Sequence, residues 1–339
     1  MRLADRLLDD DTLVATVHAA LRQRRRQSAR RGRTGAPAEI VLRLLVLKHV
    51  RNWSYAVLER EVRTNLVYRT FTRIGGGKVP DAKTMGKWGP VVGPQVVAQL
   101  HERLVAMARD ARVMEGRRMR VDTTVVESNI HYPTDSSLLG DGVRVLTRTM
   151  RKVTAIAGAV GTTLRDRSRS VKRRLMEIGR IARTKGAQRQ EKLTRAYQRL
   201  FAATSRVVGQ AKRFAQEIRT GVKRSADVMH QIALEGLREE LATFVPRIQQ
   251  VLRQARARIL RGDTHAEEKL FSLFEPSTEL IRKGKAGKPN EFGKLVKLQE
   301  AEQQIITHYE VYDHRPSDAD LLLPGIEAHT QVFGQAPRS

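Results

Sequence analysis

The sequence predicts a predominantly helical α+β protein. Apolar residues recur at the three-to-four-residue spacing of helices over most of the 339 residues. One short run, 119–126, has instead the β-branched composition of a strand. A hydrophobic content of 40% is enough to bury more than one core. We therefore expect several domains, with boundaries at 1–112, 113–143, 144–262 and 263–339.

Residues 1–112 are expected to form a helical domain. Its apolar patterns predict helices over about 11–23, 40–50, 55–67 and 95–108. Ser54 is placed to cap the third of these helices, whose apolar stripe ends at Leu66, and Asp81 is placed to cap a short helix after Pro80. Pro94 suits the first position of the last helix.

Residues 113–143 and 263–339 are expected to form one α/β unit that a long segment interrupts. Alternating or clustered apolar residues predict strands at 119–126, 269–274 and 305–312. A helix is predicted over about 318–332, with Pro324 in its early turns.

The interrupting segment, 144–262, is expected to be a basic helical insertion. It holds 29 lysine and arginine residues against 8 acidic ones. Apolar residues at coiled-coil spacing, from Leu193 to Ile218 and from Met229 to Ile259, predict an antiparallel hairpin that turns near Gly221. Thr204 occupies the one polar place in the first seam, and Pro246 is expected to kink or break the second helix.

Charge and composition restrict the class of partner. A formal net charge of +27 favours double-stranded DNA as the partner. There are no cysteines, which excludes disulfides and thiolate metal sites. No apolar run approaches the length of a membrane span, and the sequence has no secretory leader pattern. We expect a cytoplasmic bacterial protein, associated with the nucleoid.

Clusters of basic residues are the candidate DNA contacts. The run 21–33 contains arginines with no acid among them, and similar clusters lie in the insertion. A charge run is often only a solvated face, but cations unrelieved by carboxylates suit phosphate neutralisation. The expected DNA-binding residues are Arg22, Arg24, Arg25, Arg26, Arg30, Arg31, Arg33, Lys172, Arg173, Arg174, Lys212, Arg213, Lys223 and Arg224.

Asp122 is the candidate catalytic and metal-binding residue. It lies midway along the predicted strand 119–126, and a carboxylate in a buried strand is costly unless something such as a divalent cation compensates its charge. The alternative is a surface acid on the solvent side of a half-buried strand.

The segment around Asp122 resembles the first catalytic strand of DDE-type insertion-sequence transposases, most closely the ISNCY-type group, which have a ribonuclease-H-like catalytic core. The resemblance rests on Val-Asp-Thr-Thr-Val-Val at 121–126 and on Tyr-Pro-Thr-Asp-Ser-Ser-Leu-Leu at 132–139. Further marks are Trp53-Ser54-Tyr55, Val79-Pro80-Asp81, and Gly284-Lys285 with Pro289 and Glu291-Phe292-Gly293. It implies a partial ribonuclease-H-like α/β core that the basic coiled-coil hairpin interrupts.

The resemblance also implies the chemistry. Such enzymes cut and join DNA with two Mg²⁺ (or Mn²⁺) ions held by carboxylates, of which Asp122 would be the first. In the group, the second Asp lies on the strand after the first core helix and the Glu on a later helix. Here that helix is about 318–332 and the sequence ends at Ser339, so we expect a truncated, catalytically incomplete copy with strand 119–126 at an exposed edge. Glu127 is the first alternative ligand.

The expected function is therefore that of an insertion-sequence transposase that binds transposon DNA ends. A homo-oligomer is among the expected assemblies. One alternative is a non-enzymatic basic DNA-binding protein or regulator of transposition, which would account for the charge but not for the segment around Asp122. The other is a different two-metal nuclease or recombinase of the same core fold.

Overall fold

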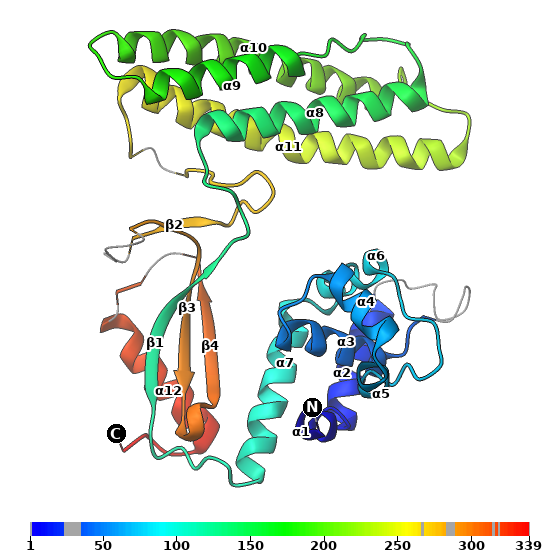
Figure 1. Ribbon diagram of the computed structural model, residues 1–339, viewed down its shortest axis with the longest axis vertical. Helices are drawn as coiled ribbons and strands as arrows, with labels where there is room; N and C mark the ends of the chain where they lie inside the picture. Colours follow the sequence, from blue (N-terminus) through cyan, green and yellow to red (C-terminus); the bar gives the residue numbers. More distant parts are fainter. Residues whose placement is uncertain are drawn as a thin grey trace. The chain divides into compact units, whose positions relative to one another are not determined.

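The computed structural model describes residues 2–23, 35–265, 268–282, 289–313, 316–317 and 319–338. The chain divides into two compact units, one of residues 1–122, 298–309 and 317–339, the other of residues 123–297 and 310–316. Helices predominate and there is also a small antiparallel sheet, so the expected α+β class is confirmed (Figure 1). Within the described residues, no helix is both long and apolar enough to cross a membrane.

The first part of the chain folds into short helices around an apolar core. They are α1 (Arg2–Leu7), α2 (Asp11–Gln23), α3 (Ala38–Val50), α4 (Tyr55–Thr64), α5 (Leu66–Phe71), α6 (Ala82–Met85) and α7 (Trp88–Asp110). Apolar residues of α2, α3 and α4 are completely or almost completely buried, among them Leu13, Val41 and Leu58. The helices predicted over 11–23 and 40–50 are thus confirmed.

Side-chain caps and backbone breaks set the helix boundaries here. Ser54 accepts a hydrogen bond from the Val57 amide, and Asp81 accepts one from the Thr84 amide, as predicted. The expected continuation of α4 to residue 67 is wrong, because Asn65 leaves the helical region and its carboxamide caps α5. Leu66, expected in the apolar stripe, is consequently exposed. Gly93, at φ +66°, interrupts α7 immediately before Pro94.

Arg43 is the polar centre of this core. Its guanidinium is completely buried and donates to Asp5, Asp9 and Glu39 at 2.6, 2.6 and 3.0 Å and to the Phe71 carbonyl at 3.1 Å. Arg73 contacts the same three acids from the end of α5. These bonds tie α1, α3 and α5 together, and they leave no hydrogen-bonding group of Arg43 in an apolar surrounding.

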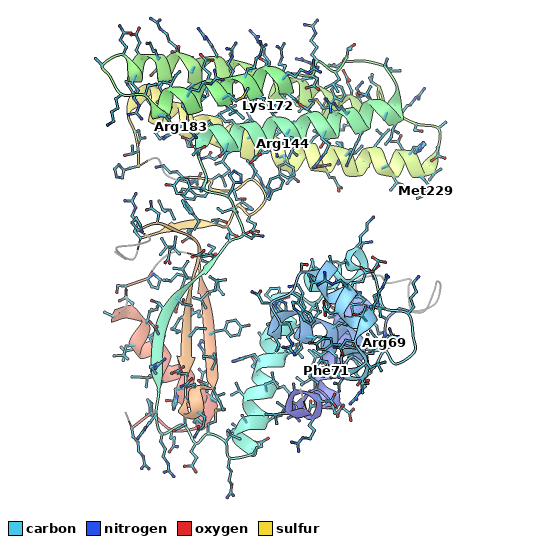
Figure 2. All side chains as sticks on the ribbon, in the orientation of Figure 1. Arg69, Phe71, Arg144, Lys172, Arg183 and Met229 are labelled. Carbon is cyan, nitrogen blue, oxygen red and sulfur yellow. The ribbon has the colours of Figure 1, made fainter. Side chains whose placement is uncertain are left out.

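Arg69 has a local structural task. Its guanidinium donates to the carbonyls of Gly75 and Gly77 at 2.6 and 2.7 Å. The glycine-rich stretch 75–77 is therefore a turn fastened to α5, where Figure 2 labels Arg69 and Phe71.

The sheet contains β1 (Arg120–Glu127), β2 (Glu279–Ile281), β3 (Glu291–Glu300) and β4 (Ile306–Tyr312). β3 pairs with all three other strands, and β1 lies at an edge of the described sheet. β2 runs antiparallel to β3, with Leu280 opposite Phe292. Gly293 is required beside β1, because a Cβ there would lie 2.1 Å from the Val126 carbonyl oxygen. The strands predicted at 119–126 and 305–312 are confirmed.

The prediction of a strand at 269–274 is wrong. That segment is irregular and is fastened to the helices instead of a sheet. Leu273 is buried in the helical core, its carbonyl accepts a bond from Arg247 at 2.7 Å, and the Leu270 amide donates to Gln254 at 2.9 Å. The sequence does not predict β3, because the lysines, glutamates and glutamine of this strand interrupt the apolar pattern.

The chain closes with the short 3-10 turn η2 (Ala319–Leu321) and α12 (Leu322–Phe333), close to the predicted span. His329 is completely buried, and its Nε2 lies 2.8 Å from the Gly116 carbonyl oxygen. Gly116 has φ +71°, and a Cβ on it would lie 2.3 Å from the Phe333 ring. This close approach connects α12 to the segment that precedes β1.

Helices α8 (Asp135–Ala157), α9 (Ser168–Arg183), α10 (Arg189–Arg219) and α11 (Val228–Arg261) pack side by side (Figure 1). The predicted hairpin is α10 and α11, and α8 and α9 complete a bundle around one apolar core. Thr134 and Ser137 form a capping box at the start of α8. Of the expected kink or break at Pro246, the break does not occur, because α11 continues through this residue. Buried neighbours such as Val245 and Ile248 stabilise the helix against the cost of proline.

The α8–α9 connection is fastened to α10 by a partly buried ion pair. Glu217 accepts hydrogen bonds from the amide and the hydroxyl of Thr162 and lies 3.4 Å from Lys223. Lys223 also donates to the Val160 carbonyl, and its ammonium lies 4.5 Å from the centre of the Phe214 ring. Burial by itself raises the pKa of Glu217, but the bonds from Thr162 and the charge of Lys223 outweigh it and hold the pKa below its ordinary value of 4.5.

Replacing Arg43 should destabilise the helices α1–α7. In Arg43→Met, three acids lose the buried one of the two arginines that they share, and we expect a loss of about 2 to 4 kcal/mol in the free energy of unfolding. Both tryptophans, Trp53 and Trp88, lie in this part of the chain, so tryptophan fluorescence during urea unfolding measures it selectively. The control Arg60→Met removes an exposed arginine paired with Glu61 and should change little. Equal effects of the two variants would contradict the role of Arg43.

Replacing Glu217 should give a destabilisation that depends on pH. Because the folded-state pKa of Glu217 lies below the unfolded value of 4.5, its carboxylate stabilises the fold above that pH, and this contribution is lost as the pH falls through the folded-state pKa. Glu217→Gln should lose about 2 kcal/mol at neutral pH, measured by far-UV circular dichroism in urea. Its deficit relative to the natural protein should shrink in acid. The control is Glu191→Gln, which removes an exposed carboxylate from the same helix. A deficit that stays constant with pH would contradict this account.

Candidate nucleic-acid interface

The arginine run near the N-terminus lies mostly beyond the described part of the chain. Arg22 is exposed in the last turn of α2. The other expected contacts of that run, Arg24, Arg25, Arg26, Arg30, Arg31 and Arg33, lie outside the described residues. Apart from Arg22, the expected contacts that the structure describes therefore all belong to the bundle or its connections.

The bundle presents most of its predicted cations to solvent. Lys172 and Arg173 on α9, Lys212 and Arg213 on α10, and Arg224 after α10 are exposed. Figure 2 labels Lys172 and Arg183 on α9 and Arg144 on α8, all three of them exposed residues. Arg174 is half-buried and bonds Glu177 at 3.1 Å, so its charge is partly compensated.

Lys223 is a correction to the predicted DNA contacts. Its side chain is only 1% exposed because its ammonium bonds Glu217 and the Val160 carbonyl and lies over Phe214. A phosphate cannot reach this ammonium without breaking those contacts. Neighbouring cations in the sequence therefore have different tasks: Arg224 faces solvent, whereas Lys223 stabilises the fold.

Two depressions on the bundle are lined by cations. One lies between α9 and α10 and is lined by Arg173, Arg180, Lys192, Arg195 and Arg199 together with Glu177. The other lies between the α8–α9 connection and α10, with Arg165, Arg167, Arg206 and Arg213 in its lining and no acid. Sequence reasoning did not single out Arg206, Arg195 or Arg199. The helical spacing of Arg199, Arg206 and Arg213, seven residues apart, is the signal that could have found Arg199 and Arg206.

Asp122 lies on the exposed face of β1. Val121, Thr123 and Val125 are the partly covered residues of this strand, and Asp122 alternates with them. Val121 lies near Gly325 of α12, so α12 covers the face opposite to Asp122. The premise that Asp122 occupies a buried strand is thus wrong, and no desolvation cost calls for a cation. Its role as a metal ligand stays a prediction.

The described residues do not assemble a metal site around Asp122. Among them, no three histidine, aspartate or glutamate side chains are grouped as ligands of one ion. Glu127 lies five residues further along β1, which corresponds to about 16 Å of extended strand, too far to share an ion with Asp122. Asp135 has a structural task instead, since it accepts bonds from Arg258 and Gln254 at 2.7 and 3.1 Å.

One comparison with known proteins gives a match, and it lies in the first part of the chain. No curated protein and no solved structure matches the chain. Residues 1–89, which hold α1–α6 and the start of α7, match the family model of a transposase domain (DUF772). The match supports a transposase family for this chain.

Proposed function

We propose that this protein is a transposase that binds the DNA ends of an insertion sequence and holds the duplex backbone on the α8–α11 bundle. The transposase-domain match at residues 1–89 supports the biological role. The single observation that carries DNA binding is the bundle itself, in which exposed cations far outnumber the acids that could compensate them.

The electrostatic argument depends on how many bundle cations are already paired. Arg174, Arg195, Arg199 and Arg238 bond acids of the same bundle. With 29 basic and 8 acidic residues in 144–262, such pairs can compensate only a minority of the charge. Like charges on neighbouring helices repel, and a bound polyanion relieves this repulsion while it releases its own counterions.

The DDE type and the ribonuclease-H-like core are part of the same proposal. The described order, in which β1, β3 and β4 precede α12, with β1 at a sheet edge, supports it, because the core that the resemblance implies begins with strands followed by a helix. Mg²⁺ belongs to the proposed family chemistry. The described residues do not fit an ion site at Asp122, so we derive no reaction step through a metal.

A non-enzymatic regulator of transposition is the second candidate. The observation in its favour is that Asp122 is an exposed side chain, whereas the bundle is strongly basic. The two candidates share DNA binding and differ in metal-dependent strand cleavage.

DNA affinity should fall steeply with salt, and the bundle should set the slope. Each phosphate neutralised contributes about −0.9 to the slope of log affinity against log salt for duplex DNA. The double variant Lys172→Gln/Arg173→Gln should reduce the magnitude of this slope by about 1 to 2 units in fluorescence-anisotropy titrations. The control Arg60→Gln/Arg63→Gln removes the same charge from α4, where both arginines are paired with acids. Similar slopes for both double variants would exclude the α9 surface.

DNA binding should not require a divalent metal. Cations of the bundle neutralise phosphates directly, so chelation with EDTA should leave the affinity for duplex DNA within about twofold. Asp122→Asn should leave affinity equal or slightly higher, because it removes a negative charge from an exposed face. A plasmid-nicking assay with Mg²⁺ or Mn²⁺ separates the two candidate functions. Nicking that Asp122→Asn abolishes would favour the enzyme, and its absence would favour the regulator.

A further inference from the structure

The depression between the α8–α9 connection and α10 differs from the neighbouring depression because its arginines form no ion pairs with acidic side chains of the described residues. Its cations are Arg165 and Arg167 from the connection and Arg206 and Arg213 from α10. Within the described residues, no acid lies within ion-pair distance of any of these four guanidinium groups. In the neighbouring depression, by contrast, Glu177 bonds Arg199 at 3.1 Å.

The one acid of the connection is committed elsewhere. Asp166 stands between Arg165 and Arg167 in the sequence, but it pairs with Arg151 of α8. It also accepts a bond from the Ser168 amide at 2.8 Å, and the bonds from Ser168 and Arg151 lower the pKa of Asp166. The structure therefore removes from this depression the only carboxylate that the local sequence could have supplied.

The depression is also preorganised. Arg206, Gly209, Gln210 and Arg213 lie at spacings of three, four and seven residues and share one face of α10. Gln210 is buried and donates to the Thr163 carbonyl at 2.7 Å, which fixes the connection beside the helix. The bonds from Thr162 to Glu217, seven residues further along α10, hold the same connection.

Gly209 leaves the floor of the depression open. A Cβ at this position would meet no atom within 4 Å, so the helix surface is hollow there. Glycine inside a helix costs about 0.5 to 1 kcal/mol relative to alanine. No packing contact requires the absence of a side chain at this position, whereas a ligand that approaches the backbone of α10 would.

We infer that this depression is a phosphate-binding site that takes a phosphodiester of the DNA backbone, an inference that rests on the proposed function. Guanidinium groups bind phosphate oxygens with two parallel hydrogen bonds, and four unpaired ones around a hollow floor suit a dianion or adjacent phosphodiesters. A volume of about 640 Å³ exceeds the needs of a single phosphate group and accommodates a stretch of backbone. The same chemistry also suits a free inorganic polyphosphate.

The test uses the full chain and three variants. Arg206→Gln removes one cation of the site, and Gly209→Leu fills its floor without changing charge or straining the helix. The matched control is Arg219→Gln, which removes an exposed arginine from the same helix outside the site. Each protein is titrated with pyrophosphate by calorimetry and with duplex DNA by anisotropy over a range of salt.

We expect Arg206→Gln and Gly209→Leu to lower the affinity for both ligands by about fivefold or more. In Arg206→Gln, the magnitude of the salt slope for DNA should also fall by about 1 unit. Arg219→Gln should change the affinity for either ligand by no more than about twofold. Loss of pyrophosphate binding alone would support the site with a free phosphate as its ligand. Natural protein that binds pyrophosphate through this site but not DNA would refute the proposed function and leave the site standing.

The inference is overturned if Gly209→Leu and Arg206→Gln match Arg219→Gln for both ligands. In that case, DNA binding by the natural protein would still stand. Failure of the natural protein to bind either ligand would overturn both proposals.

Discussion

The constraint on which the bundle depends is that an apolar core must hold together helices whose outer faces repel one another. Leu139, Leu200, Phe214, Leu241 and Ile248 are completely buried along one continuous core of α8, α10 and α11. Burial of such side chains contributes about 1.5 to 3 kcal/mol each. Because the core supplies this cohesion, the outer surface is free to carry cations without acids to compensate them, and that surface is what a polyanion would meet.

Buried polar groups fix the positions of helices and connections that apolar packing alone would not determine. Arg43 joins α1, α3 and the end of α5 through carboxylates and two carbonyls, and Glu217 with Lys223 fixes the α8–α9 connection against α10. Buried charges without partners would be costly, so each guanidinium or ammonium here is surrounded by acceptors. In the sequence, the cations that make these contacts cannot be distinguished from the exposed ones.

Position in the fold therefore separates structural cations from those available to a ligand. Lys223 and Arg224 are neighbours in the sequence, but one is enclosed by Glu217 and Phe214 and the other faces solvent. Asp166 and Arg151 neutralise each other, which leaves Arg165 and Arg167 for the depression beside α10. Asp122 illustrates the same point for carboxylates, since alternation along β1 places it opposite the face that α12 covers.

The sequence by itself determined the features that depend on local interactions. Helical periodicity and N-cap chemistry predicted α2, α3, the hairpin of α10 and α11, and the caps at Ser54 and Asp81, because caps and amphipathic faces are properties of neighbouring residues. Only the tertiary structure decided that 269–274 packs on the bundle, that the polar segment 291–300 is the central strand, and that Arg165 and Arg213 line one depression. These outcomes depend on burial and on partners distant in the chain, which no local pattern encodes.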